Sequence, residues 1–368
     1  DTVSPRLTEL LLARPGLSTL AFALFLLGFG IKMGMWPFGV VWLPAAHPAA
    51  PSPISAMLSG VMIKTGVYGL LRYFLWLVPA EGRDSFPLAA WGFLIAGLGT
   101  ITLLLGTWEA LRQEQTKRLL AFHSIGQIGY ILLGIGSALA LLEAGPGAAP
   151  LAGLALFAAL FHTVNHGIFK ALLFLNAGTL LFRSGTQDLN RLGGWFRHLP
   201  ITGVTALLAA FAIAGVPPLN GFASKWTLYV TGVRGGAYVA YLPVCTVVAI
   251  LTSALTLASF LKFFGASFLA PGRATPRPTE PLREVGGAML IPQVFLAALC
   301  LVLDADGPVG GIVVGAPSHH TFAATFTGRA AHAGVEPEKG VSAISMAADA
   351  IGRMKLGRLD EHTTANIG

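Results

Sequence analysis

The sequence predicts an all-α polytopic membrane protein of about eight transmembrane helices, two of them broken, followed by a small α/β tail. Hydrophobic residues make up 54% of the 368 residues and charged residues 11%, and the mean hydropathy is +0.70. These values lie far from those of soluble globular domains. The apolar residues are grouped in stretches long enough to cross a bilayer. The lipid bilayer is therefore the first partner that the sequence predicts.

The net charge of +7 does not indicate a nucleic-acid partner. The basic residues are scattered between apolar stretches and are not clustered with aromatic ones, so membrane topology explains them better. The two cysteines, Cys245 and Cys300, lie inside apolar stretches and offer neither a disulfide framework nor a zinc-binding spacing. The sequence shows no redox-cofactor motif, and we expect no cofactor and no functional metal site.

Eight apolar stretches are expected to cross the membrane. They are Leu17–Trp36, Ile54–Val78, Leu88–Glu109, Leu119–Leu142, Ala155–Phe182, Ile201–Val230, Val239–Leu269 and Gly286–Leu303. Pro37 ends the first stretch, because proline removes a donor and breaks a helix. The segment from Pro44 to Pro53 contains four prolines, so we expect it to be a stiff, non-helical connection.

The sixth stretch is interrupted in its middle by GVPPLNGF, from Gly215 to Phe222. Pro217 and Pro218, together with two glycines, predict a discontinuous helix here. The backbone groups that such a break frees need a hydrated or protein-lined cavity. Lys225 follows the break directly, which places an ionisable group at this cavity.

The fifth stretch carries three ionisable side chains at four-residue spacing, His162, His166 and Lys170. In a helix they share one face, drifting by roughly 40° per step over about 12 Å of the axis. Charges inside a membrane are costly, and such residues often belong to ion or proton pathways. For any one of them alone, the alternative is a lysine that snorkels to the interface or a hydrogen-bonded core histidine. Three in register favour a proton pathway.

Other ionisable side chains are distributed over the remaining stretches. Lys32 lies near the end of the first, Lys64 near the middle of the second, His123 just inside the fourth and Lys262 toward the end of the seventh. Small residues around Lys64 would permit close helix packing.

The charges of the loops predict an orientation. The loop after the first stretch has no basic residue, but the loops after the third, fifth and seventh stretches have three each. The segments on the opposite side, which are the N-terminal tail and the loops after the second, fourth and sixth stretches, have fewer. The basic residues of the three richer loops are Arg112, Lys117 and Arg118; Arg183, Arg191 and Arg197; and Arg273, Arg277 and Arg283. The richer side should be cytoplasmic, which leaves the C-terminal tail outside.

The residues after about Asp304 differ from the rest of the chain, with charges at the density of a soluble protein. Residues Thr321–Phe326 alternate well enough for a strand, and Gly340–Met354 has the pattern of an amphipathic helix. A tail of roughly 65 residues would be marginal as a separate domain. The chain begins without Met and stops without an evident terminating element, and we expect it to be a fragment.

Residues Leu27–Arg72 resemble the proton-translocating, antiporter-like subunits shared by complex I, multisubunit cation/proton antiporters and membrane-bound hydrogenases of the formate hydrogenlyase type. TKRLLAFHSIGQIGY, FHTVNHGIFKALLFLNAG and GVPPLNGFASKW resemble the next three signatures of that family, in the family's order. The resemblance covers roughly residues 15–302. It implies two inverted repeats, each with one broken helix and a buried lysine relay, and as partners the other subunits of a membrane complex.

The resemblance also implies which residues carry protons. They are Lys32, Lys64, His162, His166, Lys170 and Lys225, with His123 and Lys262 as possible further members. Lys225 occupies a position that is Glu in many hydrogenase-type relatives, so the subfamily is left open. The glutamate that would pair with Lys32 belongs to an earlier helix, and no residue before Leu17 supplies it.

The tail resembles the start of the lid, or dimerisation, domain of peptidase T and carboxypeptidase-type di-zinc metallopeptidases. Asp304 matches a metal-ligand aspartate, His332 in AHAG matches the lid histidine and Asn366 matches a lid asparagine. The other ligands of the family are missing, and a lone aspartate cannot hold two zinc ions. For His319 and His320, a solvent-exposed strand entry is favoured over a metal site.

The sequence therefore predicts an antiporter-like transmembrane domain over 1–302, N-terminally incomplete, and a partial lid domain over 303–368. The function expected is proton translocation through a buried Lys/His relay in an inner-membrane redox-driven or antiporter complex, with no redox or peptidase site of its own. Two alternatives stay open: a non-functional fusion of two gene fragments, and a membrane-anchored metallopeptidase remnant.

Overall fold

The computed structural model describes residues 13–76, 87–271, 283–305, 357–358 and 364–365. The chain divides into two compact units, Asp1–Asp304 and Ala305–Gly368. The assignment of an incomplete antiporter-like domain and a partial lid domain to these parts of the chain stays a prediction.

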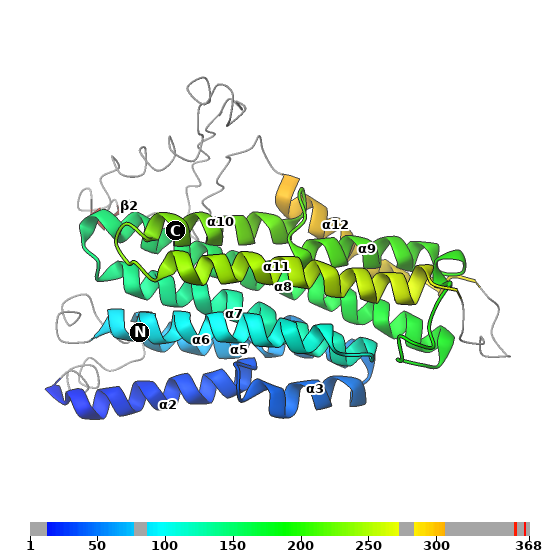
Figure 1. Ribbon diagram of the computed structural model, residues 1–368, viewed down its shortest axis with the longest axis horizontal. Helices are drawn as coiled ribbons and strands as arrows, with labels where there is room; N and C mark the ends of the chain where they lie inside the picture. Colours follow the sequence, from blue (N-terminus) through cyan, green and yellow to red (C-terminus); the bar gives the residue numbers. More distant parts are fainter. Residues whose placement is uncertain (1–12, 77–86, 272–282, 306–356, 359–363, 366–368) are drawn as a thin grey trace, which may run out of the picture. The chain divides into compact units, whose positions relative to one another are not determined.

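The secondary-structure elements of the described part of the first unit are all helices (Figure 1). Its longer helices are α2 (Pro15–Met33), α3 (Gly39–Ala49), α6 (Leu88–Leu111), α7 (Thr116–Leu142), α8 (Ala149–Ser184), α9 (Pro200–Ala214), α10 (Asn220–Gly235), α11 (Leu242–Phe264) and α12 (Gly287–Ala305). The shorter ones are α4 (Ser52–Met57), η1 (Leu58–Met62), α5 (Lys64–Leu71), η2 (Arg72–Trp76), η4 (Pro146–Ala148), η5 (Trp195–Arg197) and η6 (Gly265–Leu269).

Six of the described helical segments are long and apolar enough to cross a membrane, and α9 and α12 are shorter apolar helices. The six are Pro15–Met33, Ser52–Leu75, Leu88–Leu111, Thr116–Leu142, Pro146–Ser184 and Leu242–Leu269. The predicted class, an all-α polytopic membrane protein, is confirmed. The α9–α10 pair and α12 occupy the places of the sixth and eighth expected spans, and the number of spans stays a prediction.

The first broken helix is α2–α3. After Met33, Gly34 takes a left-handed conformation with φ of 89°, and Gly34 N and Met35 N both donate to Gly30 O, at 3.1 and 2.8 Å. This αL turn closes the last carbonyls of α2, and glycine adopts it without steric cost. Pro37 follows, and α3 starts at Gly39.

The second broken helix, α9–α10, ends its first half in the same way. Gly215 has φ of 81°, and Gly215 N and Val216 N donate to Phe211 O at 3.1 and 3.0 Å. The helix resumes at Asn220. The first halves of the two broken helices, α2 and α9, therefore end in the same kind of αL turn. In each case a proline follows within three residues, and it lacks the N–H that a continuing helix needs.

The expectation of a non-helical connection from Pro44 to Pro53 was wrong. Pro44 and Pro48 lie inside α3, and Pro51 and Pro53 lie at the start of α4. Pro53 stands in the first turn of α4, where its nitrogen has no intrahelical partner to lose. Inside α3, Pro44 and Pro48 each remove one helical hydrogen bond, and the chain stays helical around them. Only the extended residue Ala50 and Pro51 separate the two helices.

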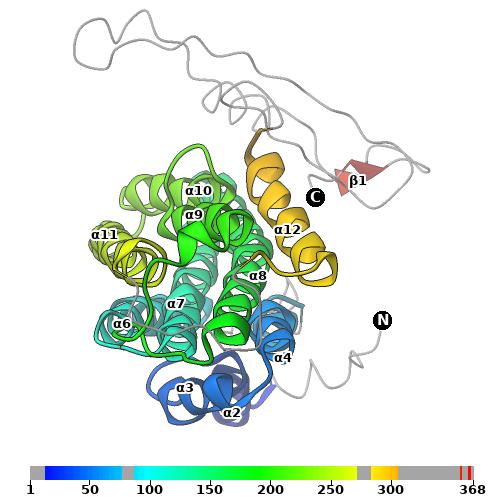
Figure 2. The ribbon, with the colours of Figure 1, turned by 90° about the vertical axis from the view of Figure 1, so that its right-hand side faces the viewer.

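Helix α7 is the core of the bundle, because 94% of the residues in its most apolar 18-residue segment are buried. Figure 2, which looks along the helices, shows α7 between α6 and α8, with α11 close by. Glycines allow α6 to approach α7 closely, because a Cβ at Gly99 would lie 2.6 Å from Leu133 N and one at Gly106 2.6 Å from Gly126 N. Small residues at such an interface bring helix backbones into direct contact.

The described residues of the second unit form two short strands, β1 (Gly357–Arg358) and β2 (Thr364–Ala365), paired antiparallel. The strand expected at 321–326 and the helix expected at 340–354 lie outside the described residues.

Candidate functional site

The polar face of α8 lies inside the bundle. His162, His166 and Lys170 are all completely buried, and the two imidazole rings are stacked with centroids 6.3 Å apart and planes at 12°. A helix of 36 residues without a break holds the three side chains in one row. The structure thus places three ionisable groups in the interior of a membrane protein, where such groups are costly.

His162 is held by neutral polar side chains from two other helices. Its Nδ1 lies 2.9 Å from Ser224 Oγ of α10 and its Nε2 3.1 Å from Gln127 Oε1 of α7. Neither ring nitrogen of His166 has a hydrogen-bond partner within the described residues. His166 therefore contributes two buried nitrogen atoms that the neighbouring side chains leave open.

Lys170 points toward α7, where its ammonium donates to Leu120 O. The same ammonium lies 5.5 Å from the centroid of the Phe174 ring. On the other side, His47 of α3 stacks on Phe174 with centroids 4.3 Å apart. His47 is completely buried. Sequence reasoning missed it, because it lies in the proline-rich segment that was expected to be a loop.

Lys64 lies at a π-helical turn between α4 and α5. Its ammonium donates to Ser59 O, within the π-turn η1. The Ser59 hydroxyl lies 2.8 Å from Ser124 Oγ of α7, and Ser124 Oγ also donates to Leu120 O at 3.1 Å. A chain of hydrogen bonds through two carbonyls and two serine hydroxyls therefore joins Lys64 to Lys170. Single π-helical turns of this kind are frequent at functional sites.

Lys225 follows the break between α9 and α10 and is 1% exposed. Its ammonium donates to Ile213 O at 2.8 Å and to Ser253 Oγ of α11 at 3.0 Å. It also lies 4.5 Å from the centroid of the Tyr130 ring. The charge therefore faces the free carbonyl end of α9, which favours a cation.

Two asparagines join the break to α8. Asn165 Nδ2 donates to Asn220 O at 2.8 Å, and Asn220 Nδ2 donates to Asn165 Oδ1 at 3.2 Å. Both are completely buried. Sequence reasoning missed these residues, and also Gln127 and Ser224, because single neutral polar residues are common in helices and carry no spacing signal. Gln127, an amide in the middle of a predicted membrane span, was a hint.

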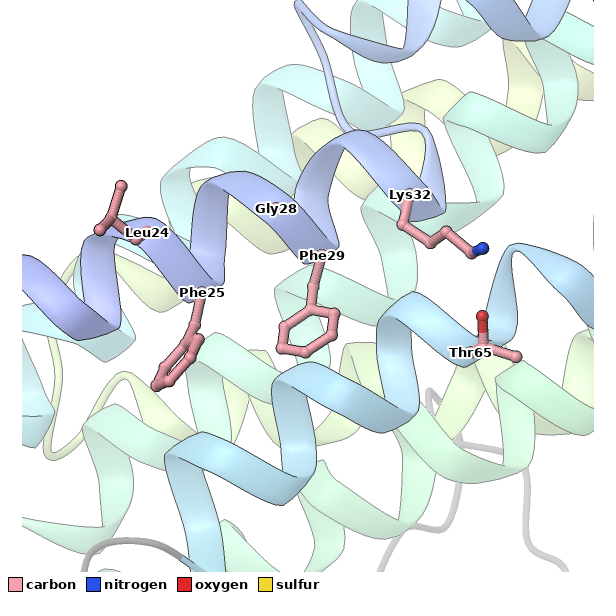
Figure 3. Close-up of a pocket in the computed structure, with 6 residues that line it drawn as sticks. All are labelled: Leu24, Phe25, Gly28, Phe29, Lys32 and Thr65. Atoms are coloured by element: carbon pink, nitrogen blue, oxygen red, sulfur yellow. The ribbon is translucent and has the colours of Figure 1, made fainter. Parts of the chain in front are cut away.

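Lys32 lies apart from the buried row. Lys32 stands in the last turn of α2, and its side chain is exposed. It lines a pocket of about 420 Å³ together with Leu24, Phe25, Gly28, Phe29 and Thr65. Figure 3 shows Lys32 and Thr65 together at one end of this pocket, with Phe25 and Phe29 lining it toward the start of α2. The pocket is mostly apolar with a cation at one end, so it suits a carboxylate or water beside Lys32.

The two possible further members differ in their surroundings. His123 is completely buried, with Nε2 2.8 Å from Ser259 Oγ. Lys262 donates to Leu111 O at 2.6 Å and to Gln113 O at 2.7 Å. These carbonyls lie at the C-terminal end of α6, where a cation stabilises the helix dipole. The contacts of Lys262 thus favour a structural role.

The described residues contain no group of three or more His, Cys, Asp or Glu side chains that could hold a metal ion. Asp304 lies in the last turn of α12. His319, His320, His332 and Asn366 lie outside the described residues.

A row of buried lysines and histidines, flanked by two broken helices, defines the class of this protein: a multi-pass membrane protein with an ionisable interior. Residues 6–252 match the family model described as NADH:quinone oxidoreductase/Mrp antiporter, TM. The chain belongs to this family.

Curated relatives include hydrogenase-4 component B of Escherichia coli, 38% identical over 78% of this chain and 42% of the relative. Formate hydrogenlyase subunit 3 of Escherichia coli is 34% identical over 82% of this chain and 48% of its own length. Among solved structures, the archaeal membrane-bound sulfane sulfur reductase has a chain with a TM-score of 0.68 and 31% identity, covering 84% of this chain and 48% of that one. The chain spans less than half the length of these relatives.

Residues 314–368 match a second family model, the peptidase dimerisation domain. This match agrees with the lid-domain resemblance of the tail, although it covers a small part of the chain.

Proposed function

We propose that this chain translocates protons across a membrane through the buried row of lysines and histidines, as a subunit of a redox-driven or antiporter complex. The observation that carries the proposal is the burial of Lys170, His166, His162 and Lys225 in one bundle. His162 also hydrogen-bonds Ser224 of α10, the helix that carries Lys225. The relatives support the assembly, because they are components of hydrogenase-4, formate hydrogenlyase and a respiratory membrane complex.

The order of groups supports a path. A chain of hydrogen bonds joins Lys64 to Lys170 by way of Ser59, Ser124 and Leu120 O. Because a backbone carbonyl accepts hydrogen bonds but cannot pass a proton on, transfer between the two lysines needs water. His166 and His162 continue along α8, and His162 hydrogen-bonds Ser224 of α10, the residue before Lys225. Desolvation disfavours the charged form of a buried lysine, so it releases its proton more readily than a lysine in water.

The entrance of the path lies at Lys32 and its pocket. The Lys32 side chain is exposed in the described part of the chain, unlike the buried row. We place the protein in the inner membrane, with the loops that carry three basic residues each on the cytoplasmic side.

The test replaces Lys170 and Lys225, one at a time, by Met in the membrane complex that contains this chain. Methionine keeps the length and packing of the side chain but cannot carry a proton. We expect proton translocation to fall at least tenfold in both variants, as removal of a positioned acid–base group usually does. Complex assembly on native gels is the control. Translocation at the parental rate in both assembled variants contradicts the proposal.

For the tail we propose a partial metallopeptidase lid without catalysis. The match of residues 314–368 to the peptidase dimerisation domain supports the fold, and the missing His-x-Asp motif and paired glutamates argue against activity. The full chain should hydrolyse no small peptides. A stoichiometric peptidase activity that chelators abolish would overturn this assignment.

The alternative of two joined gene fragments is tested at the level of the gene product. The intact mass of the expressed protein, together with the genomic reading frame on both sides of Asp304, distinguishes a continuous chain from a joining error. A single frame and a matching mass exclude the joining error.

A further inference from the structure

Gln127 of α7 is an amide that contacts the row on α8 from the neighbouring helix. It is completely buried, and its Oε1 lies 3.1 Å from His162 Nε2. An amide oxygen can only accept a hydrogen bond, so Nε2 carries the hydrogen and Nδ1 is the free nitrogen of the neutral ring. The hydrogen bond to Gln127 thus fixes one of the two tautomers of His162.

The backbone around Gln127 holds this amide in place. A Cβ at Gly126 would lie 2.6 Å from Thr107 Oγ1 of α6, and a Cβ at Gly129 would overlap Leu103 N of the same helix. These glycines stand directly before Gln127 and two residues after it. Helix α7 therefore cannot turn or slide at this point without breaking close contacts with α6.

On its other side, His162 faces a hydroxyl that can serve both of its charge states. Ser224 Oγ lies 2.9 Å from His162 Nδ1 and 3.3 Å from both Asn220 O and Gly221 O. When the ring is neutral, the hydroxyl donates to Nδ1. When Nδ1 is protonated, the hydroxyl accepts from Nδ1–H and turns its own hydrogen to one of the carbonyls. Nδ1 can therefore gain and lose a proton without movement of the ring, whereas Nε2 stays bonded to an amide.

Gln127 supplies its hydrogen bond without adding a charge. The titratable groups around His162 are His166 on its own helix, Tyr130 of α7, Lys225 of α10 and Lys64 of α5. No acidic side chain of the described residues is among them. The imidazolium form of His162 therefore has cations and no counter-ion beside it, and a neutral partner at Nε2 leaves the ring free to give up its proton.

We propose that Gln127 is a positioning residue of the relay, which keeps the hydrogen on His162 Nε2 and so makes Nδ1 the nitrogen at which His162 takes up and gives up protons. This inference rests on the proposed proton translocation. On arrival, a proton from the preceding member of the relay forms an N–H bond at Nδ1 and gives the imidazolium. On departure to the next member the same bond breaks, and the neutral ring is restored with its hydrogen still on Nε2.

The experiment compares two substitutions of Gln127 in the membrane complex that contains this chain. Gln127→Leu removes the hydrogen bond, and translocation should fall about tenfold at every pH, because the acid–base group is no longer held in position. Gln127→Glu keeps an accepting oxygen but sets a carboxylate beside the imidazolium, which then retains its proton to higher pH. The rate of this variant should fall about tenfold at neutral pH and recover as the pH rises, with the pH of half-maximal rate raised by about one unit or more.

The matched control is Gln293→Glu, which makes the same change at another buried glutamine. Gln293 lies on α12 and is 1% exposed. Its amide nitrogen donates to Thr179 Oγ1 at 2.9 Å and to Met289 O at 2.8 Å, and neither residue belongs to the row. We expect the parental rate and pH profile there. Assembly on native gels is measured for every variant.

A double variant tests whether Gln127 acts through His162. His162→Phe keeps a ring in the row but cannot carry a proton. In that background Gln127→Leu should cause no further loss, because the group on which Gln127 acts has already been removed. Two independent losses would instead multiply to about a hundredfold and overturn the proposal. If Gln127→Glu fails to assemble, this comparison decides.

The outcomes separate the two proposals. If Lys225→Met stops translocation but both Gln127 variants translocate at the parental rate, the positioning role is wrong and the relay stands. Equal losses in Gln127→Leu and Gln127→Glu with an unchanged pH profile would show a packing role and also overturn the inference. If Lys170→Met and Lys225→Met both translocate at the parental rate, the relay itself fails.

Discussion

Two lysines of the same chain show how much the surroundings decide the role of a residue. Lys225 is 1% exposed and reaches a free helix end, a serine hydroxyl and an aromatic ring. Lys262 is only part-buried and makes both of its hydrogen bonds to carbonyls at the end of α6. The contacts of Lys225 offer a route for a proton, whereas those of Lys262 cap the C-terminal end of α6.

This difference gives a prediction for Lys262→Met. The variant should lose the capping interaction, about 0.3–1 kcal/mol of the free energy of unfolding, and should translocate protons at the parental rate. Thermal unfolding of the complex and a translocation assay measure the two effects. A loss of translocation as large as that of Lys225→Met would place Lys262 in the relay.

The buried asparagine pair gives a second prediction at this scale. In Asn220→Ala, Asn165 loses an amide partner in a fully buried place. Leaving a buried polar group unsatisfied costs about 1–3 kcal/mol, so the thermal midpoint should fall. The double variant Asn165→Ala/Asn220→Ala should be less than additive, because the second change removes the group that the first one orphaned. Additive losses would mean that the two side chains do not act as a pair.

Among the helices, close packing between α6 and α7 depends on glycine at defined positions. A Cβ at Gly99 would meet Leu133 N at 2.6 Å and Gly129 O at 2.9 Å, whereas one at Gly97 would meet nothing within 4 Å. The two positions are two residues apart on the same helix. They therefore separate the effect of packing from the helix propensity of glycine.

Gly99→Ala should lower the free energy of unfolding by about 1–3 kcal/mol, since the backbones must move apart. Gly97→Ala should be neutral or stabilise by up to about 1 kcal/mol, because alanine is the better helix former. Chemical denaturation of the detergent-solubilised protein gives both values. Equal effects at the two positions would argue against close α6–α7 contact.

For the whole molecule, the testable property is its orientation in the membrane. Arg191 lies in a loop that carries three basic residues, and Ala144 lies in the connection at the other end of α8. The two native cysteines are buried, so they should give little background in cysteine labelling.

With an impermeant thiol reagent, Arg191→Cys should react only in inside-out vesicles and Ala144→Cys only in intact cells. The reason is the retention of basic loops on the cytoplasmic side. The native chain serves as the control for background labelling. The reverse pattern would invert the topology and with it the direction of the relay.

The membrane class, the two helix breaks and the row on α8 were predictable from the sequence. These features depend on local properties: apolar stretches long enough to span a bilayer, glycine followed within three residues by proline at each break, and a four-residue spacing that fixes one helix face. The family resemblance added which of these ionisable residues form the proposed relay.

Which groups meet depends on the tertiary structure. Ser253 and Tyr130 come to Lys225 from two other helices, and Leu111 meets Lys262 across 151 residues of chain. Such contacts depend on how helices pack, and neutral hydroxyls and carbonyls leave no signal in a sequence. The helical state of α3, which its prolines did not lead us to expect, was likewise visible only in the fold. Removing single donors does not break a helix that its neighbours hold in place.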